Sequence, residues 1–325
     1  MKKILSVLLT VSLIGTFVLG GCGSKGKEEK TKESKEIVVA TNSETGGLDP
    51  AGMIALTYLA YSVSALDELL TYNEDGEIEY RAAESYEVND DSTVWTFHLR
   101  KEAAWSDGTP VTSADFLNTM VRSLDPKSGN GYANYLFPIK NAEAIYNGEA
   151  DADSLGVETP DDDTLIFTLE KPCVYFLDLL RLPVYTPSCT KYADSVDSGW
   201  DKDPATSVSN GPFHLTEYVA EQYFVLEKNP EYWNADQVKL DKITYRFFDD
   251  TQSMANAYET GEVDVAPSLQ SSVMELYEGK DDLVITDTIA TRYIYPNLNV
   301  EPLDDVRVRL SLIHISEPTR RTPIS

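Results

Sequence analysis

The sequence predicts an α/β fold, and three observations carry this prediction. Short apolar or alternating runs typical of strands recur along the chain. Between them lie stretches whose apolar residues are spaced as on one face of a helix. Clusters of Asn, Asp, Gly and Pro separate the runs and indicate turns. Strands and helices therefore alternate, which is the order found in α/β proteins.

The beginning of the folded region predicts a strand, a loop, a helix and a turn. The apolar run at 37–40 is typical of a buried strand, and the small and polar residues of 41–50 predict a loop. Apolar residues at helical spacing predict a helix over 57–70. Residues 73–77 predict a hairpin-type turn, in which Gly76 supplies the positive φ.

Two segments predict strands that bury one face. Residues 94–99 alternate between apolar and polar side chains, and residues 164–169 repeat this pattern. His98 lies on the polar face of the first strand. Its simplest role is therefore that of a surface residue rather than of a ligand-binding group.

A helix is predicted between these two strands. Residues 106–110 read Ser-Asp-Gly-Thr-Pro and predict a tight turn, and residues 112–115 form a capping box. The helix then runs over 116–124 and stops at Asp125-Pro126, because proline disfavours a helical residue before it.

The second half of the chain continues the alternation. The turn sequence Asn-Gly-Pro-Phe at 210–213 is followed by strands at 223–227 and 243–248. A helix over 251–259 ends at Gly261, a residue suited to the position after a helix. Residues 263–266 predict one more strand.

Composition excludes several classes of function. The chain has 27 Lys and Arg against 54 Asp and Glu, a formal net charge of −27. Such a surface repels nucleic acid and anionic lipid headgroups, so no nucleic-acid partner is expected. The sequence has none of the HExxH, GxSxG, P-loop or CxxC motifs. We therefore predict no catalytic residue, no metal site and no cofactor.

The cysteines and the N-terminus indicate an exported protein. Lys2 and Lys3 precede an apolar run over 4–19, and small residues lead to Cys22. This pattern resembles a lipoprotein signal, in which the chain is cut before Cys22 and the thiol receives a diacylglycerol. The alternative is an ordinary cleaved signal with an incidental cysteine. Cys173 and Cys189 form either a disulfide or two buried free thiols.

The boundaries of the N-terminal segments follow from composition. Residues 1–22 are the predicted signal peptide, and the polar residues 23–36 are a predicted disordered tether. The folded part begins near Ile37. The bilayer is then a partner through the acyl chains on Cys22, and the protein lies on the outer face of the bacterial cell membrane.

An ordered series of motifs resembles one known family, the extracellular solute-binding proteins of peptide ABC importers (family 5, the oligopeptide-binding group). Its landmarks are Leu48-Asp49-Pro50, LLTYNEDGEIE (69–79), AAESYEV (82–88), TFHLRKEAAWSDGTPVTSADF (96–116), LDPKS (124–128), YLFPIKNAEAIYNGE (135–149), LGV (155–157), TLEKPCVYFLDLL (168–180), NGPF (210–213), LEKNPEYW (226–233), YETGEVDVA (258–266) and DDVRVR (304–309). The resemblance covers about residues 37–309.

The resemblance implies a type II periplasmic-binding-protein-like architecture with two lobes and an inserted subdomain. Residues 37–70 and 195–289 then form the first lobe, and residues 71–194 are the inserted subdomain. Residues 290–309 begin the second lobe, most of which is absent from this sequence. The implied protein is a monomer that binds an oligopeptide between its lobes and, once closed, is recognised by the membrane permease subunits of an ABC importer.

The same resemblance implies a set of ligand-binding residues. A general peptide receptor bonds the ligand main chain as an added strand, because the main chain is the part that all peptides share. The candidates are Ser43, Glu44, Thr45, Tyr132, Asn210, Gly211, Thr291, Tyr293 and Tyr295. Each has a structural alternative: a polar loop at a strand end for the first three, a core aromatic for Tyr132, a plain turn for Asn210 and Gly211, and a half-buried strand for the last three.

The last residues differ in character from the rest. Residues 310–325 show no helical period, are basic in an acidic protein, and resemble the translation of a sequencing-library adapter. We therefore expect this stretch to be non-native and His314 to carry no function. Because closure needs two lobes, we also expect residues 37–309 alone not to bind peptides tightly; micromolar binding measured by calorimetry would contradict this.

Three other functions remain open from sequence. The same scaffold binds other solutes in some relatives, so a nickel chelate, a glycan or a peptide pheromone is an alternative ligand. A surface adhesin or chaperone would show ligand-independent protein binding. A secreted hydrolase would need a nucleophile–base pair or a metal cluster, and the sequence shows neither.

Overall fold

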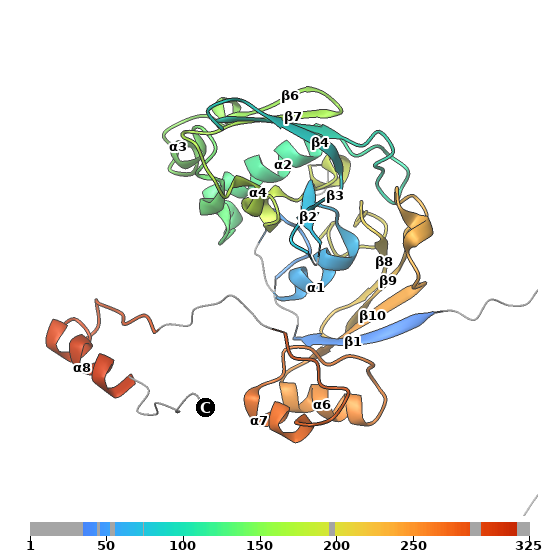
Figure 1. Ribbon diagram of the computed structural model, residues 1–325, viewed down its shortest axis with the longest axis vertical. Helices are drawn as coiled ribbons and strands as arrows, with labels where there is room; N and C mark the ends of the chain where they lie inside the picture. Colours follow the sequence, from blue (N-terminus) through green and yellow to red (C-terminus); the bar gives the residue numbers. More distant parts are fainter. Residues whose placement is uncertain are drawn as a thin grey trace, which may run out of the picture. The chain divides into compact units, whose positions relative to one another are not determined.

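The computed structural model describes residues 35–43, 46–52, 56–73, 75–194, 199–286 and 294–316 (Figure 1). These residues belong to two compact units, one that extends to Leu269 and one that starts at Gln270. The elements are β1 (Glu36–Asn42), α1 (Leu56–Ala65), β2 (Leu70–Tyr72), β3 (Ile78–Tyr80), β4 (Ala83–Val88), β5 (Val94–Leu99), α2 (Ser113–Leu124), α3 (Ala142–Tyr146), β6 (Val157–Asp161), β7 (Thr164–Thr168), α4 (Phe176–Leu179), α5 (Thr190–Ala193), β8 (Phe213–Val219), β9 (Tyr223–Lys228), β10 (Lys242–Phe248), α6 (Thr251–Glu259), α7 (Ser271–Met274) and α8 (Val306–Ser316).

The first sheet of the first unit joins the beginning of the chain to its later part. Its strand order is β1-β10-β9-β8. Strand β1 runs parallel to β10 in the register Glu36 to Lys242, and the other neighbours are antiparallel. Helix α1 packs against β1 and β8, and α6 packs against β10. This mixed sheet with helices confirms the predicted α/β class.

The second sheet lies wholly within residues 83–168. Its order is β4-β5-β7-β6 with antiparallel neighbours, and α2 packs against β6 (Figure 1). Strands β5 and β7 bury alternate residues, as their patterns predict. Phe97 and Phe167 meet edge to face at 5.8 Å, and Phe167 meets Phe176 at 5.3 Å in the same way.

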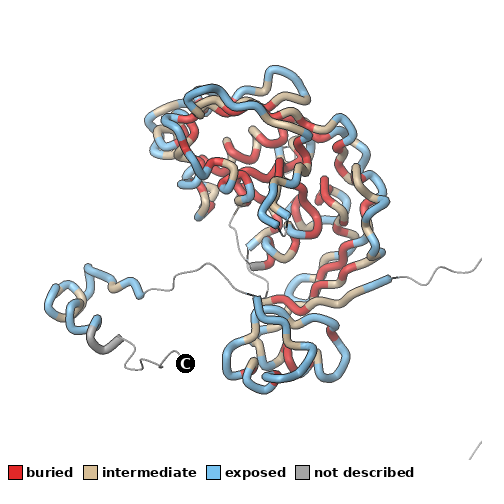
Figure 2. Tube along the Cα trace, in the orientation of Figure 1, coloured by how far each residue is buried: buried red, intermediate tan, exposed pale blue. Residues whose placement is uncertain are grey.

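A continuous apolar core runs from one sheet to the other. Figure 2 shows the buried chain segments gathered between the sheets and along α1 and α2. Trp105, Tyr58, Tyr185, Phe116 and Phe224 are among its largest fully buried side chains. A second cluster of buried residues, with Met254 and Val263, lies under α6.

Several predicted elements are confirmed at their bounds. Helix α2 ends at Leu124, and α6 covers the predicted 251–259. Hairpin β2–β3 encloses the predicted turn with Gly76 at φ +78°. Strands β4, β6 and β8 are elements that the sequence patterns did not predict.

The predicted helix over 57–70 is wrong over its last five residues, 66–70. Helix α1 ends at Ala65, and Leu70 already begins β2. Main-chain groups between them bond to distant segments instead of to the helix: the Asp67 N–H donates to Asn210, and the Leu69 carbonyl accepts from Ala83. The apolar residues continue past the end of α1 because the extended stretch at 66–70 is also buried.

The strand predicted at 263–266 is reduced to a single parallel bridge. Val265 pairs with Val39 of β1, and the Ala40 N–H donates to the Val265 carbonyl at 2.8 Å. The Asp264 side chain accepts the Val38 N–H at 2.8 Å, so a carboxylate replaces a main-chain acceptor at this edge.

The second unit contains α7 and α8 among its described residues. A helix nevertheless forms in the first part of 310–325, although this stretch has no helical period: α8 runs from Val306 to Ser316. The Asp305 carboxylate accepts the Arg307 N–H at 2.8 Å at the helix start. No proline or glycine lies between Val306 and Pro318, so no helix-breaking residue interrupts α8. The proposed adapter origin of this segment stays a prediction.

Candidate functional site

The candidate site begins where two parallel strands end side by side. Residue Asn42 of β1 pairs with Phe248 of β10. Ser43 follows, and its N–H donates to the Phe248 carbonyl at 2.9 Å, while its hydroxyl donates to Asp249 at 2.5 Å. In open α/β sheets, ligands bind outside the carboxyl ends of the strands. The predicted contact Ser43 therefore lies at an edge suited to a ligand.

The far end of the loop after β1 is held by a buried carboxylate. Asp201 is 9% exposed and accepts the N–H groups of Leu48 at 2.6 Å and Asp49 at 3.3 Å. Gly47 touches the same carboxylate: a Cβ at this position would lie 2.4 Å from its Oδ2. Three consecutive residues are thus placed by one side chain.

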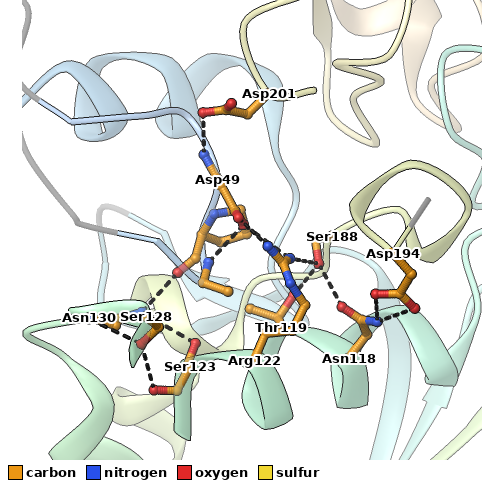
Figure 3. A network of polar contacts seen from close by, with 12 residues as sticks. Asp49, Asn118, Thr119, Arg122, Ser123, Ser128, Asn130, Ser188, Asp194 and Asp201 are labelled. Atoms are coloured by element: carbon orange, nitrogen blue, oxygen red, sulfur yellow. Dashed lines mark hydrogen bonds and ion pairs between the residues drawn. The ribbon is translucent and has the colours of Figure 1, made fainter. Parts of the chain in front are cut away.

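The Asp49 carboxylate in turn connects the loop to α2. It accepts the Ala51 N–H at 3.0 Å and forms an ion pair with Arg122 (Figure 3). The guanidinium of Arg122 also donates to Ser188 at 3.3 Å and lies 5.8 Å from the Trp200 ring. Both partners of the ion pair are largely shielded from solvent, so removing either one leaves the other charge poorly compensated.

Asn130 joins this loop to the predicted contact Tyr132. Its side-chain amide donates to the Pro50 carbonyl at 3.3 Å and to Ser123 at 3.2 Å, and its oxygen accepts the Tyr132 N–H at 2.8 Å. The Tyr132 ring is half-buried and packs on Tyr135 at 5.6 Å. Tyr132 is thus tied through Asn130 to Pro50 in the loop after β1, whereas Ser43 is bonded to β10.

Asn210 and Gly211 lie at the opposite end of α1. The Asn210 side chain accepts the Asp67 N–H and donates to the Asp67 carbonyl, both at 3.0 Å. The Gly211 N–H donates to the Ala65 carbonyl at 2.9 Å. Because α1 has 10 residues, about 15 Å of helix separates this junction from the loop after β1. The ligand role of both residues stays a prediction, and their polar groups bind within the chain here.

A pair of buried carboxyl groups lies beside this junction. Asp67 is 3% exposed and accepts from Trp233 at 3.0 Å and Tyr232 at 3.4 Å. Burial raises the pKa of Asp67 to about 6, although the Trp233 bond and the Arg81 charge oppose the shift. Burial likewise raises the pKa of Glu68 to about 7, and the charge of Asp67 adds to this shift.

These two carboxyl groups predict a pH-dependent stability. In the unfolded chain both pKa values lie near 4, so folding favours the protonated forms. The stabilisation is complete below about pH 4 and is lost as the pH rises through 6 and 7. We expect the melting temperature of Glu68→Gln to fall less between pH 5 and 8 than that of the parent chain. Glu84→Gln, at an exposed position, is the control; equal slopes in parent and Glu68→Gln contradict the prediction.

The remaining predicted residues are placed as follows. Tyr295 is 79% exposed and belongs to the second unit. Cys22, Glu44, Thr45, Thr291 and Tyr293 lie outside the described residues.

Cys173 and Cys189 are buried free thiols, which is one of the two alternatives that the sequence left open. Burial raises the pKa of the Cys189 thiol to about 11, so it stays protonated at neutral pH. Within the described ranges, no group of three His, Cys, Asp or Glu side chains could hold a metal ion. No helix of these ranges is long and apolar enough to cross a membrane.

Sequence patterns missed the residues that hold the loop. Asp49 was visible only as part of the Leu48-Asp49-Pro50 landmark. Arg122 carried a weak signal, as a basic side chain on the polar side of a predicted helix. Asp201 and Asn130 carried no signal, because only the fold brings them to the loop.

Comparison with known proteins gives a consistent picture. Residues 77–315 match the family described as bacterial extracellular solute-binding proteins, family 5 Middle. The periplasmic oligopeptide-binding protein OppA of Escherichia coli strain K12 is 35% identical over 290 residues, which make up 87% of this chain and 53% of OppA. The probable deoxycholate-binding periplasmic protein YgiS of the same strain is 34% identical over 279 residues, 83% of this chain and 51% of YgiS.

A solved structure of a relative has a similar fold. Haemophilus influenzae OppA in complex with the peptide RPPGFSPFR superposes with a TM-score of 0.78 and 28% identity, over 86% of this chain and 56% of that protein. This chain therefore spans about half the length of the curated relatives that it matches.

Proposed function

The chain belongs to the bacterial extracellular solute-binding proteins of family 5, and from this premise we propose that the intact protein captures oligopeptides outside the cytoplasm for an ABC importer. It is a binding protein rather than an enzyme. The observation that carries the choice of ligand is the 35% identity to an oligopeptide-binding protein over 87% of the chain. The permease subunits of the importer are the proposed protein partner, and a monomer is the proposed state.

The geometry of the loop after β1 supports main-chain recognition. Peptides differ in side chains, so a general receptor bonds their amide groups, as one strand bonds another. Ser43 stands at the carboxyl end of β1, and the loop is fixed to β10, to Asp201 and to α2. We propose that Ser43, Glu44 and Thr45 contact the ligand main chain and that Tyr132 faces it from the inserted subdomain.

Calorimetry of the complete gene product tests this function. We expect peptides of mixed sequence to bind with dissociation constants in the micromolar range or below. Nickel chelates, sugars and a bile salt are measured as competing candidates for the ligand. The bile salt is included because a relative named as deoxycholate-binding is 34% identical. Tight binding of one of these competitors and no binding of peptides would replace the proposed ligand.

We also propose the lipid anchor. The support is the sequence of residues 1–22, with a charged start, an apolar run and small residues before Cys22. In cells fed an alkyne-tagged fatty acid, we expect the protein to be labelled and to sediment with membranes. Cys22→Ala is expected to abolish both, whereas Cys173→Ala leaves them unchanged. Labelling that survives Cys22→Ala would show that this thiol is not the acylated group.

The division into lobes is part of the same proposal. The first lobe comprises 37–70 and 195–289, the inserted subdomain 71–194, and the second lobe starts at 290. In support, the strands of one sheet come from residues 36–42 and 213–248, and those of the other from 83–168.

A further inference from the structure

The loop after β1 is positioned by a residue that lies about 150 positions away. Asp201 accepts the Leu48 N–H across a separation of 153 residues and the Asp49 N–H across 152. We propose that Asp201 is the positioning residue of the ligand-binding loop, and that peptide affinity depends on its carboxylate. This inference rests on the proposed function.

The contact between Asp201 and the loop leaves no room for a side chain at position 47. The Oδ2 atom lies so close to the Gly47 backbone that a Cβ there would be 2.4 Å away, which real Cβ atoms do not tolerate. Hydrogen bonds from N–H groups to a carboxylate are shorter and stronger than those to a neutral acceptor. Glycine at 47 and aspartate at 201 are therefore a matched pair, since any side chain at 47 would displace the carboxylate.

The Asp201 carboxylate is itself held by a well-packed segment. The Thr206 hydroxyl donates to the Trp200 carbonyl at 2.8 Å, and the Tyr61 hydroxyl of α1 pairs with Ser209 at 3.1 Å. Trp200 is 8% exposed. These contacts fix residues 199–209 against α1. Asp201 therefore holds the loop in a fixed position relative to that segment.

Precise placement matters for the proposed ligand contacts. Hydrogen bonds to a peptide main chain need donors and acceptors fixed to within about 0.5 Å, which rigid support provides. Without Asp201, the loop keeps its anchors at Ser43 and at the Asp49–Arg122 pair but loses the one between them. A loop that must be ordered on binding lowers affinity, mostly through faster dissociation.

Hydrogen exchange on the present chain tests the positioning directly. We expect Asp201→Ala to speed exchange of the Leu48 and Asp49 amides at least tenfold, and Asp201→Asn, which keeps one acceptor oxygen, to have a smaller effect. Asp203→Ala is the matched control, because this nearby carboxylate is exposed and accepts the N–H of Ala205, two residues along the chain. Unchanged exchange at Leu48 in Asp201→Ala overturns the inference.

Peptide binding by the complete gene product tests the consequence. We expect the peptide dissociation rate to rise about tenfold or more in Asp201→Ala, with partial recovery in Asp201→Asn. Val157→Ala, in the buried start of β6, controls for loss of stability alone and is expected to keep the parent dissociation rate. Faster amide exchange with unchanged peptide dissociation overturns the positioning role but leaves the proposed function intact. A parent protein that binds no peptide overturns the proposed function and this inference with it.

Discussion

Replacing Gly211 by alanine is expected to destabilise the chain by about 3 kcal/mol, the result of overpacking a site that cannot expand. A Cβ on Gly211 would lie 2.7 Å from the carbonyl carbon of Ala65, 2.8 Å from its oxygen and 2.8 Å from the Leu66 nitrogen. All three are main-chain atoms, so no side-chain rotation relieves the contact. The hydrogen bond from the Gly211 N–H to Ala65 would be lost as well.

Thermal unfolding measures this effect. At this size, 3 kcal/mol corresponds to a fall in melting temperature of roughly 6–12 °C. Gly131→Ala is the control, because nothing lies within 4 Å of a Cβ there and its φ is not in the left-handed region. Equal melting temperatures for Gly211→Ala and Gly131→Ala would contradict this, because they would show that the main chain at the end of α1 accommodates the added methyl group at little cost in stability.

The second large effect is expected at Asp115, the third residue of α2. Its side chain is buried, 5% exposed as a residue, and accepts five hydrogen bonds. One oxygen accepts the Trp105 indole N–H at 3.2 Å and the N–H and hydroxyl of Thr112. The other accepts the N–H of Thr190 at 2.9 Å and its hydroxyl at 2.7 Å. This one carboxylate therefore ties the turn at 105–112 and the start of α5 to α2.

Asp115→Ala leaves a buried indole N–H and two main-chain N–H groups without an acceptor. Each unsatisfied buried donor costs about 1–3 kcal/mol, so the expected loss is at least about 3 kcal/mol. Urea unfolding measures it as a lower midpoint at similar slope. Asp115→Asn keeps one acceptor oxygen, so its urea midpoint is expected to lie between those of the parent and the alanine variant. Asp90→Ala, at an exposed turn, is the control, and its midpoint is expected to match that of the parent. A midpoint for Asp115→Ala within experimental error of Asp90→Ala would contradict this account.

Individual helices and strands show how much of the fold could be predicted from the sequence. The capping box at 112–115 predicted α2, because its pattern is local. The strong alternation of β5 and β7 predicted buried faces that the structure confirms. The predicted end of α1 was wrong because the Asp67 N–H donates to Asn210, 143 residues away, instead of continuing the helix. Such a choice depends on partners that no window of sequence contains.

The site was predicted more weakly than the fold for the same reason. The resemblance predicts both Ser43 and Tyr132 as ligand contacts, but in the structure Asn130 joins Tyr132 to Pro50 and not to Ser43. Asn210 and Gly211 were named together with them, yet their contacts lie at the other end of α1. Asp201 was missed because a lone aspartate in a loop has no pattern. A long-range contact, rather than spacing, gives it importance.

The pairing of β1 with β10 has a consequence for when the first sheet is completed. These strands are joined across about two hundred residues; the Lys35 N–H, for instance, donates to Asp241 across 206 positions. Closing a loop of that length costs on the order of 3 kcal/mol more entropy than closing a ten-residue loop. Hairpins β8–β9 and β9–β10 are local, so they are expected to form first and β1 to dock last. During synthesis the N-terminus emerges first, so β1 stays unpaired until residue 248 has followed. In that interval the sheet is open to misassembly.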